Sequence, residues 1–452
     1  MDWVIRFFGP FVVPLIIILF VVGVLPLIAG YVVLLERKIM ADMQARLGPM
    51  RVGPHGLLQP IADALKLLIK EDIIPEEADK AIFWMAPLIS VTAAMLSFAA
   101  LTFAPGSATF FGHSAPYAVA DMNIGLLFIL AVSSMGIYGI VLGGWASNNH
   151  YSLLGALRGS AQLVSYEVAA GMALVAGVLM AGSLSTKTII EAQTSNGVWF
   201  AFLSPVAFFI YLVASIAETN RAPFDLPEAE SELVAGYMTE YSGFRWAIYF
   251  LAEYANVIVV SSIAVTMFLG GWQRPFGNMK GFAFLDYLAP LALAAVGLYC
   301  FYRAPKLKEK PHRAVMPLFG LIMFALAGIV ALPLLPQFAA WKPVIHGVFW
   351  FIAKVTAYIY AFMWFRFTFP RYRFDQLMKL GWHFLIPLSI VNVFCLAIAL
   401  LLAKPAAEGG PGYSLGAMCI LATVITLLIG GWLAWQSEKR EEREREAFAA
   451  GD

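Results

Sequence analysis

The sequence predicts an all-α, polytopic integral membrane protein with about eleven transmembrane helices and one interfacial amphipathic helix. Only 13% of its 452 residues are charged, about half the usual fraction, while 61% are hydrophobic and the mean hydropathy is +0.77. A soluble domain with so few charged residues lacks the surface charge that keeps it in water. The composition therefore excludes a soluble enzyme, a nucleic-acid binder driven by basic charge, and a disordered chain.

Continuous apolar runs locate the expected spans, because a helix needs about 20 apolar residues to cross the hydrocarbon of a bilayer. Eleven such runs are found: 11–33, 81–103, 122–143, 162–182, 200–217, 247–271, 282–301, 315–335, 344–365, 383–403 and 414–435. Their continuity excludes a transmembrane β-barrel, whose strands alternate in polarity. The first run continues into Leu35-Glu36-Arg37-Lys38 without a cleavage site of small residues, which indicates a retained helix rather than a secretory signal.

The distribution of Lys and Arg predicts the orientation of these spans. With the segment 34–80 placed inside, the inside segments hold 23 basic residues and the outside segments hold six. Because basic residues collect on the cytoplasmic side, we expect the N-terminus outside and the C-terminus in the cytoplasm. The mixed-charge tail 438–446 is expected to continue as a solvated helix.

The three cysteines, Cys300, Cys395 and Cys419, lie in separate apolar runs. Iron–sulfur clusters and zinc sites need several ligands at short, fixed spacings. We therefore expect no metal site, no redox centre and no disulfide framework in this chain.

Two inside loops differ from ordinary connectors, and the first is 48–71. A turn rich in Gly and Pro leads into a helical pattern over 57–70. One face of this helix is apolar: Leu57, Leu58, Ile61, Leu65, Leu68 and Ile69. Asp63, Lys66 and Lys70 lie on another face, and the helix is too short to span, so it should lie in the interface plane. The pattern fits either a helix that only anchors the chain at the membrane surface or a helix that borders the entrance for an amphiphilic substrate.

The second loop is acidic, although it lies on the side where the chain collects bases. It carries six acids against one base, Arg221: Glu218, Asp225, Glu228, Glu230, Glu232 and Glu240. Pro223 and Pro227 prevent one continuous helix here. Clustered carboxylates can share protons, which suits a proton relay, and they can equally form a docking face for a basic partner subunit.

Two more carboxylates, Glu167 and Glu253, lie inside predicted spans. A charged group at the bilayer centre costs about 2.5–3.5 kcal/mol even on the lenient insertion scale, so such residues normally face a polar interior and serve a function. The alternative is that each lies near a helix end and reaches water. Lys354 is a weaker case of the same kind, and Asp286 is expected near the outside end of its span.

Four segments carry a resemblance to a known family. They are RVGPHGLLQPIADALKL at 51–67, ETNRAPFDLPEAESELVAGY at 218–237, LERK at 35–38 and FPRYRFDQLM at 369–378. Together they resemble the signatures of subunit 1, also called the H-type subunit, of respiratory complex I, the proton-translocating NADH:quinone oxidoreductase. The resemblance covers roughly 11–275 and 344–403.

The resemblance implies an eight-helix core that joins the hydrophilic arm to the proton-pumping arm in a bacterial inner membrane. It implies an enzyme subunit with no redox centre of its own, whose partners carry the iron–sulfur clusters and flavin. The implied partners are hydrophilic-arm subunits at the quinone site and small and antiporter-like membrane subunits. Five residues would line or support the quinone chamber and its entrance: Arg37, Leu57, Gln59, Asp63 and Lys66. The proton-coupling chain would comprise Glu167, Glu218, Asp225, Glu228, Glu230, Glu232, Glu240 and Glu253.

The chain also departs from the family pattern. We divide it into a core of six helices (1–275), an inserted two-helix hairpin (276–343), two further core helices (344–403), and an extra helix with a charged tail (404–452). The two inserted spans preserve the orientation of everything after them. We expect these additions to pack peripherally or contact neighbouring subunits.

Two alternative functions stay open at this point. The first is the homologous membrane subunit of an energy-converting hydrogenase-type complex, in which quinone can be absent. The second is a stand-alone ion transporter that uses the buried acids. Transporters often contain inverted repeats, and we find none in the sequence.

Overall fold

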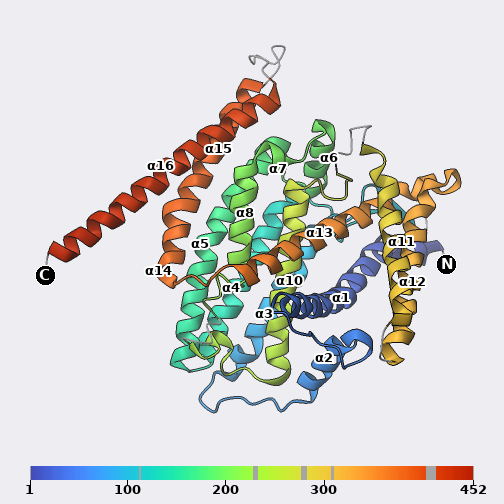
Figure 1. The fold of residues 1–452 in the computed structure, drawn as a ribbon, viewed down its shortest axis with the longest axis horizontal. Coiled ribbons are helices and arrows are strands. Elements are labelled where there is room, and N and C mark those ends of the chain that lie inside the picture. Colours follow the sequence, from blue (N-terminus) through green and yellow to red (C-terminus); the bar gives the residue numbers. More distant parts are fainter. Residues whose placement is uncertain are drawn as a thin grey trace.

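The computed structural model describes residues 2–110, 113–227, 233–275, 282–306, 310–403 and 414–450 (Figure 1). It confirms an all-α polytopic membrane protein: within these ranges, ten helices are long and apolar enough to cross a bilayer. The long helices are α1 (Asp2–Met43), α3 (Lys80–Ser97), α4 (Gly125–Ala146), α5 (His150–Ala181), α10 (Gly243–Phe268), α11 (Leu285–Arg303), α12 (Lys310–Ala331), α13 (Lys342–Thr368), α15 (Ile386–Ala403) and α16 (Leu415–Ala450).

Shorter elements connect the long helices. They are η1 (Pro54–Gly56), α2 (Gln59–Ile69), η2 (Phe98–Ala100), α6 (Thr186–Asn196), α7 (Phe200–Leu203), α8 (Pro205–Glu218), η3 (Gly236–Met238), η5 (Ala304–Lys306), η6 (Leu332–Leu334), η7 (Pro336–Trp341), α14 (Phe374–Lys379) and η8 (Leu380–Leu385). Two short strands, β1 (Ser107–Phe110) and β2 (His113–Pro116), pair antiparallel between α3 and α4.

The remaining expected span, 200–217, is formed by two helices. Ser204 has φ −135° and ψ 70°, so the chain leaves helical geometry there, and Pro205 begins α8. Proline is well tolerated at a first helical position because its missing N–H would have no partner within the helix. The break makes α8 a 14-residue helix that ends at Glu218.

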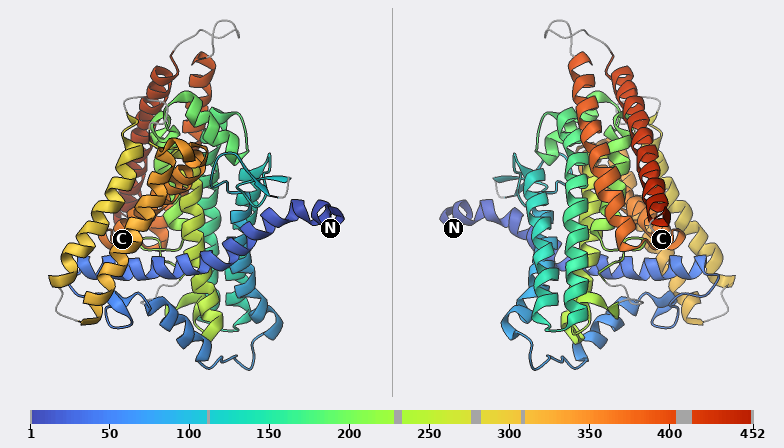
Figure 2. Two further views of the ribbon diagram at one scale, coloured as in Figure 1. Left: turned by 90° about the vertical axis from the view of Figure 1, so that its right-hand side faces the viewer. Right: turned by 90° about the vertical axis from the view of Figure 1, so that its left-hand side faces the viewer.

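Helix α1 crosses the other helices at a steep angle, as both views in Figure 2 show. It packs against α2, α10 and α13. The expected amphipathic helix is confirmed as α2, none of whose residues is buried, and Leu65, Leu68 and Ile69 are exposed. Its apolar face is therefore available to a bilayer or to an amphiphile.

The centre of the bundle is built on α10, α5 and α8. Every residue of α10 from Val257 to Phe268 is buried, which accounts for a span that is apolar all round. Small residues allow the helices to approach closely. At Gly177 of α5, for example, a Cβ would lie 2.8 Å from Cε of Met267 on α10.

The segments that we expect to be additions, the inserted hairpin and the C-terminal helix, lie at two edges of the bundle (Figure 1). Helices α11 and α12 form an antiparallel hairpin whose close approach uses glycine on both sides: a Cβ on Gly297 would lie 3.1 Å from the carbonyl oxygen of Gly320. Helix α16 packs on α15 and continues through the charged tail as one helix, as expected.

Candidate functional site

A polar cavity of about 40 Å³ lies where α4, α5, α8 and α10 meet. Its wall contains three carboxylates from three different helices: Glu167 of α5, Glu218 at the end of α8, and Glu253 of α10. These acids are far apart in the sequence, and the fold brings them to one space. A polar cavity of this size has room for a few water molecules, which can bridge groups that do not touch directly.

Glu253 is held by two partners inside the bundle. Its Oε2 accepts from Nη2 of Arg221 at 3.2 Å, and its Oε1 accepts from the Tyr237 hydroxyl at 3.0 Å. Glu253 is only 7% exposed. A buried carboxylate needs such compensation, because an isolated buried charge loses its hydration. The interior position disfavours the interpretation that Glu253 reaches water at a helix end.

Glu167 lies near the middle of α5 and accepts a hydrogen bond from the Ser134 hydroxyl of α4. Ser134 is also 2.8 Å from the carbonyl oxygen of Leu130, so one hydroxyl lies near two acceptors. Glu167 is half-buried and lines the cavity. This position also disfavours the helix-end interpretation.

The acidic loop folds back against the bundle between Glu218 and Pro227. Nε2 of Gln162 on α5 donates to the carbonyl oxygens of Ala217 and Phe224, each at 2.8 Å. The Tyr372 amide donates to the Pro223 carbonyl at 3.1 Å. Asp225 is half-buried in this folded segment. Glu228, Glu230 and Glu232 lie outside the described residues.

Glu240 lies apart from the cavity. Its Oε1 accepts from Nδ2 of Asn149 at 2.6 Å, and Oδ1 of Asn149 caps α5 by accepting from the Tyr151 amide. Glu240 therefore supports the start of α5. Nearby Tyr241 lies outside the spans, and burial raises the pKa of its hydroxyl to about 12, against smaller lowering effects of Tyr249 and Arg245. Its phenol therefore stays protonated around neutral pH.

A second cluster lies beside the first, around Glu36 of α1. Glu36 is 8% exposed, pairs with Arg366 of α13, and accepts from the Tyr254 hydroxyl at 2.9 Å. These three residues line a second cavity together with Arg221. The Arg221 guanidinium also stacks 4.4 Å from the centroid of the Tyr254 ring. Arg221 thus lies between Glu36 and Glu253.

The α1–α2 junction carries three of the expected entrance residues. Nη1 of Arg37 lies 2.7 Å from Oδ2 of Asp63, and Nε2 of Gln59 donates to Oδ1 of the same residue at 2.9 Å. The structure does not place the other two in this hydrogen-bonded group: Leu57 is half-buried and Lys66 is exposed.

Several polar partners were missed from the sequence, chiefly Ser134, Tyr237, Tyr254 and Arg366. Glu36, Arg221 and Tyr237 belong to the segments that carry the family resemblance, but the sequence predicts no site role for them. A usable signal existed for Arg221, since it is the one base in an acidic loop and a buried carboxylate requires a counter-charge. Arg366 carries no comparable signal, because it lies 330 residues from Glu36.

Lys354, the weaker buried candidate, takes no part in these clusters. Its Nζ donates to the carbonyl oxygens of Leu269 and Gln273 at 2.6 and 2.9 Å, where α10 ends. Cations at this end of a helix satisfy carbonyls that lack partners within the helix. Within the described ranges, no group of three or more His, Cys, Asp or Glu residues is arranged to hold a metal ion.

Comparison with known proteins agrees with this architecture. Residues 15–397 match the family described as NADH dehydrogenase. The chain is 51% identical over 401 residues to the second H-type NADH-quinone oxidoreductase subunit of Solibacter usitatus, covering 87% of this chain and 98% of that protein. It is 49% identical over 391 residues to the first H-type subunit of Koribacter versatilis, covering 82% and 88% of the two chains. It is 40% identical over 401 residues to the H-type subunit of Thermomicrobium roseum, covering 87% and 96%.

Proposed function

The chain belongs to the NADH dehydrogenase family, and we propose that it is the H-type membrane subunit of a proton-translocating NADH:quinone oxidoreductase. In this role it forms the membrane end of the quinone chamber. Electrons reach quinone from an iron–sulfur cluster in a neighbouring subunit, and flavin lies further away in the hydrophilic arm. This chain contributes positioning, charge and proton pathways.

The proposed quinone entrance lies between α1 and α2. Quinones are amphiphilic, with a polar head and an apolar tail, so their path needs an apolar surface that leads to polar groups. Helix α2 offers exposed Leu65 and Leu68, and the Arg37–Asp63–Gln59 group lies at its contact with α1. This arrangement supports the interpretation of α2 as part of an entrance over that of a plain surface anchor.

The observation that carries the coupling proposal is the cavity shared by Glu167, Glu218 and Glu253. Carboxylates that share one low-dielectric space interact strongly with one another, which suits a path along which protons move. Arg221 connects this cavity to the Glu36–Arg366 pair. A change of charge around Glu36 would therefore strengthen or weaken the ion pair between Arg221 and Glu253. In the proposed path, this change would couple the second cavity to proton movement in the first.

We propose a bacterial inner membrane as the location, with the N-terminus outside and the charged tail of α16 in the cytoplasm. The 23-to-6 division of basic residues supports this orientation. The cytoplasmic side then carries α2 and the acidic loop, which supports contact with hydrophilic-arm subunits there. Small and antiporter-like membrane subunits would complete the proton path.

The test uses the assembled complex in vesicles and the variants Glu167→Gln and Glu218→Gln, which leave the Arg221–Glu253 pair intact. Each keeps the side-chain shape and removes the titratable proton, so we expect proton pumping and quinone reduction to fall together while assembly persists. Glu191→Gln, an exposed carboxylate of α6, is the matched control. Full pumping in both cavity variants would refute the coupling role. Purification of the chain as a lone oligomer would refute the complex itself.

A further inference from the structure

Helix α11 carries one exposed face whose chemistry changes along its length. Leu288, Leu291 and Leu298 are exposed on it, followed by the exposed rings of Tyr299 and Tyr302. Positions 288, 291, 298 and 302 follow the spacing of three to four residues that keeps side chains on one side of a helix. Tyr287 is also exposed at the start of this face, the leucines occupy its middle, and the phenols of Tyr299 and Tyr302 follow as α11 approaches its end at Arg303.

The phenols at this end are paired with cations. Nε of Arg303 donates to the Tyr299 hydroxyl at 2.9 Å, and Nζ of Lys306 lies 3.6 Å from the centroid of the Tyr302 ring. Both pairs are spaced by four residues, so they lie side by side. Arg303 and Lys306 are exposed, and this end of the hairpin thus presents two positive charges directly beyond two amphipathic rings.

A third cation comes from the start of α12. Nη2 of Arg313 donates to the carbonyl oxygen of Pro305 at 2.6 Å, which joins the two helices across the turn, and Arg313 is exposed. The sequence 303–313 contains five Lys or Arg residues and a single acid. We define the basic turn by Arg303, Lys306 and Arg313, the three of these cations whose side chains the structure describes.

We propose that this face binds a phospholipid with a negatively charged headgroup. The basic turn would hold the phosphate, because cations beside the ends of membrane helices attract anionic lipid headgroups. Tyr299 and Tyr302 would lie at the level of the glycerol, where aromatic rings prefer the interface. Leu288, Leu291 and Leu298, which lie further from the basic turn along α11, would contact an acyl chain.

The order of these groups favours a lipid over an acidic protein. An acidic protein surface needs only the cations, whereas the continuous aliphatic stripe from Leu288 to Leu298 requires an apolar partner in line with the charge. A phospholipid supplies both parts in that order.

The hairpin is also fixed in place, so its face is presented in one position. At its other end, Asp286 of α11 pairs with Nζ of Lys342 at 2.8 Å and with Nη1 of Arg274 at 3.1 Å. His346 lies 2.9 Å from the Val330 carbonyl of α12. The residues before and after the hairpin are thereby joined to both of its helices.

Helix α12 also packs against η1, the turn that precedes α2. The proposed lipid face and the α1–α2 junction therefore belong to one connected part of the protein. Quinone reductase activity is nevertheless a separate property, and the lipid test does not depend on it.

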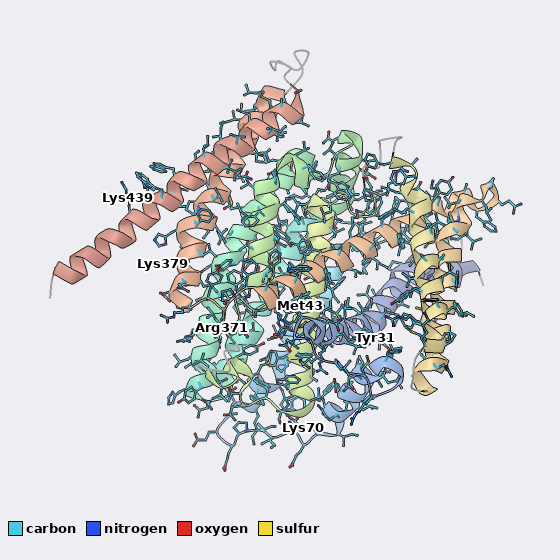
Figure 3. All side chains as sticks on the ribbon, in the orientation of Figure 1. Tyr31, Met43, Lys70, Arg371, Lys379 and Lys439 are labelled. Atoms are coloured by element: carbon cyan, nitrogen blue, oxygen red, sulfur yellow. The ribbon has the colours of Figure 1, made fainter. Side chains whose placement is uncertain are left out.

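The experiment compares lipids retained by the intact complex after exchange into nanodiscs of phosphatidylglycerol and phosphatidylcholine, with native mass spectrometry as the readout. The preference for phosphatidylglycerol should be roughly thirtyfold lower in the Arg303→Gln/Lys306→Gln variant than in the wild type. The conservative Arg303→Lys/Lys306→Arg variant should keep most of the preference. Lys379→Gln/Lys439→Gln removes two exposed bases on the opposite edge of the bundle (Figure 3) and should match the wild type.

Each outcome decides for or against the proposal. An unchanged phosphatidylglycerol preference in Arg303→Gln/Lys306→Gln overturns it. Loss of a partner subunit from that variant, with lipid retention unchanged, assigns the basic turn to an acidic protein instead. Quinone reductase activity measured on the same samples shows whether the complex itself has failed.

Discussion

Arg221 and Glu253 form an ion pair inside the bundle, with Nη2 of the arginine 3.2 Å from Oε2 of the glutamate. The pair joins the acidic loop to α10. It also connects two cavities, since Glu253 lines one and Arg221 lines the other as well as contacting Glu253. A change in the charge of either partner therefore affects both the stability of the fold and the proposed proton path.

Replacing Arg221 by Gln should destabilise the protein strongly, because it leaves the Glu253 carboxylate buried without its counter-charge. Losing one partner of a buried pair typically costs about 3–5 kcal/mol. The Arg221→Gln/Glu253→Gln double variant should recover part of that loss, because both charges are then absent. Thermal unfolding of the purified protein measures both effects, with exposed Arg46→Gln as the control. A double variant less stable than Arg221→Gln alone would contradict this account.

Gln162 should determine the position of the loop that follows α8. Its Nε2 donates to the carbonyls of Ala217 and Phe224, and a Leu at this position would leave both without that donor. When a buried polar group loses its hydrogen-bond partner, the free energy of unfolding falls by about 1–3 kcal/mol. We expect faster amide hydrogen exchange over 217–227 in Gln162→Leu. Exposed Gln436→Leu should leave exchange there unchanged, and protection equal to the wild type in both variants would argue against the role of Gln162.

The Arg37–Asp63 pair should matter more for substrate than for stability. Its side chains are 41% and 25% exposed, so solvent screens the pair and its contribution to folding should be at most about 1 kcal/mol. Under the proposed function, Asp63→Asn should raise the KM for quinone with little change in the unfolding temperature. Lys66→Gln should raise KM less, because exposed Lys66 lies outside the Arg37–Asp63–Gln59 group. An equal or larger effect at Lys66 would show that the entrance extends along the polar face of α2.

The spans could be predicted because each depends on local composition, and the amphipathic α2 depends on local periodicity. The break at Ser204–Pro205 was visible as a proline within an apolar run, but membrane helices often tolerate proline, so its effect depended on packing. The pairing of Arg221 with Glu253 and of Arg366 with Glu36 could not be predicted. These residues meet only through the packing of α8, α10, α1 and α13. A single sequence does not show which residues that are distant along the chain come into contact.

Two glycines of α5 test how closely the cavity depends on backbone packing. A Cβ on Gly155 would lie 2.7 Å from Cα of Gly236 and 2.9 Å from the Tyr237 amide nitrogen, whereas a Cβ on Gly171 would have nothing within 4 Å. Gly155→Ala should therefore displace η3 and with it the Tyr237 hydroxyl that donates to Glu253, at a cost of about 1–3 kcal/mol. Gly171→Ala should be neutral or slightly stabilising, since Ala favours helix by up to about 1 kcal/mol over Gly.

The measurements for this glycine pair are thermal unfolding and coupled quinone reduction in the assembled complex. Both variants add the same methyl group to the same helix, so a general effect on α5 would appear in both. We expect Gly155→Ala alone to lower the unfolding temperature and, under the proposed function, the coupled rate. Equal behaviour of the two variants would mean that η3 can move without disturbing Glu253, and that Tyr237 is dispensable for holding it.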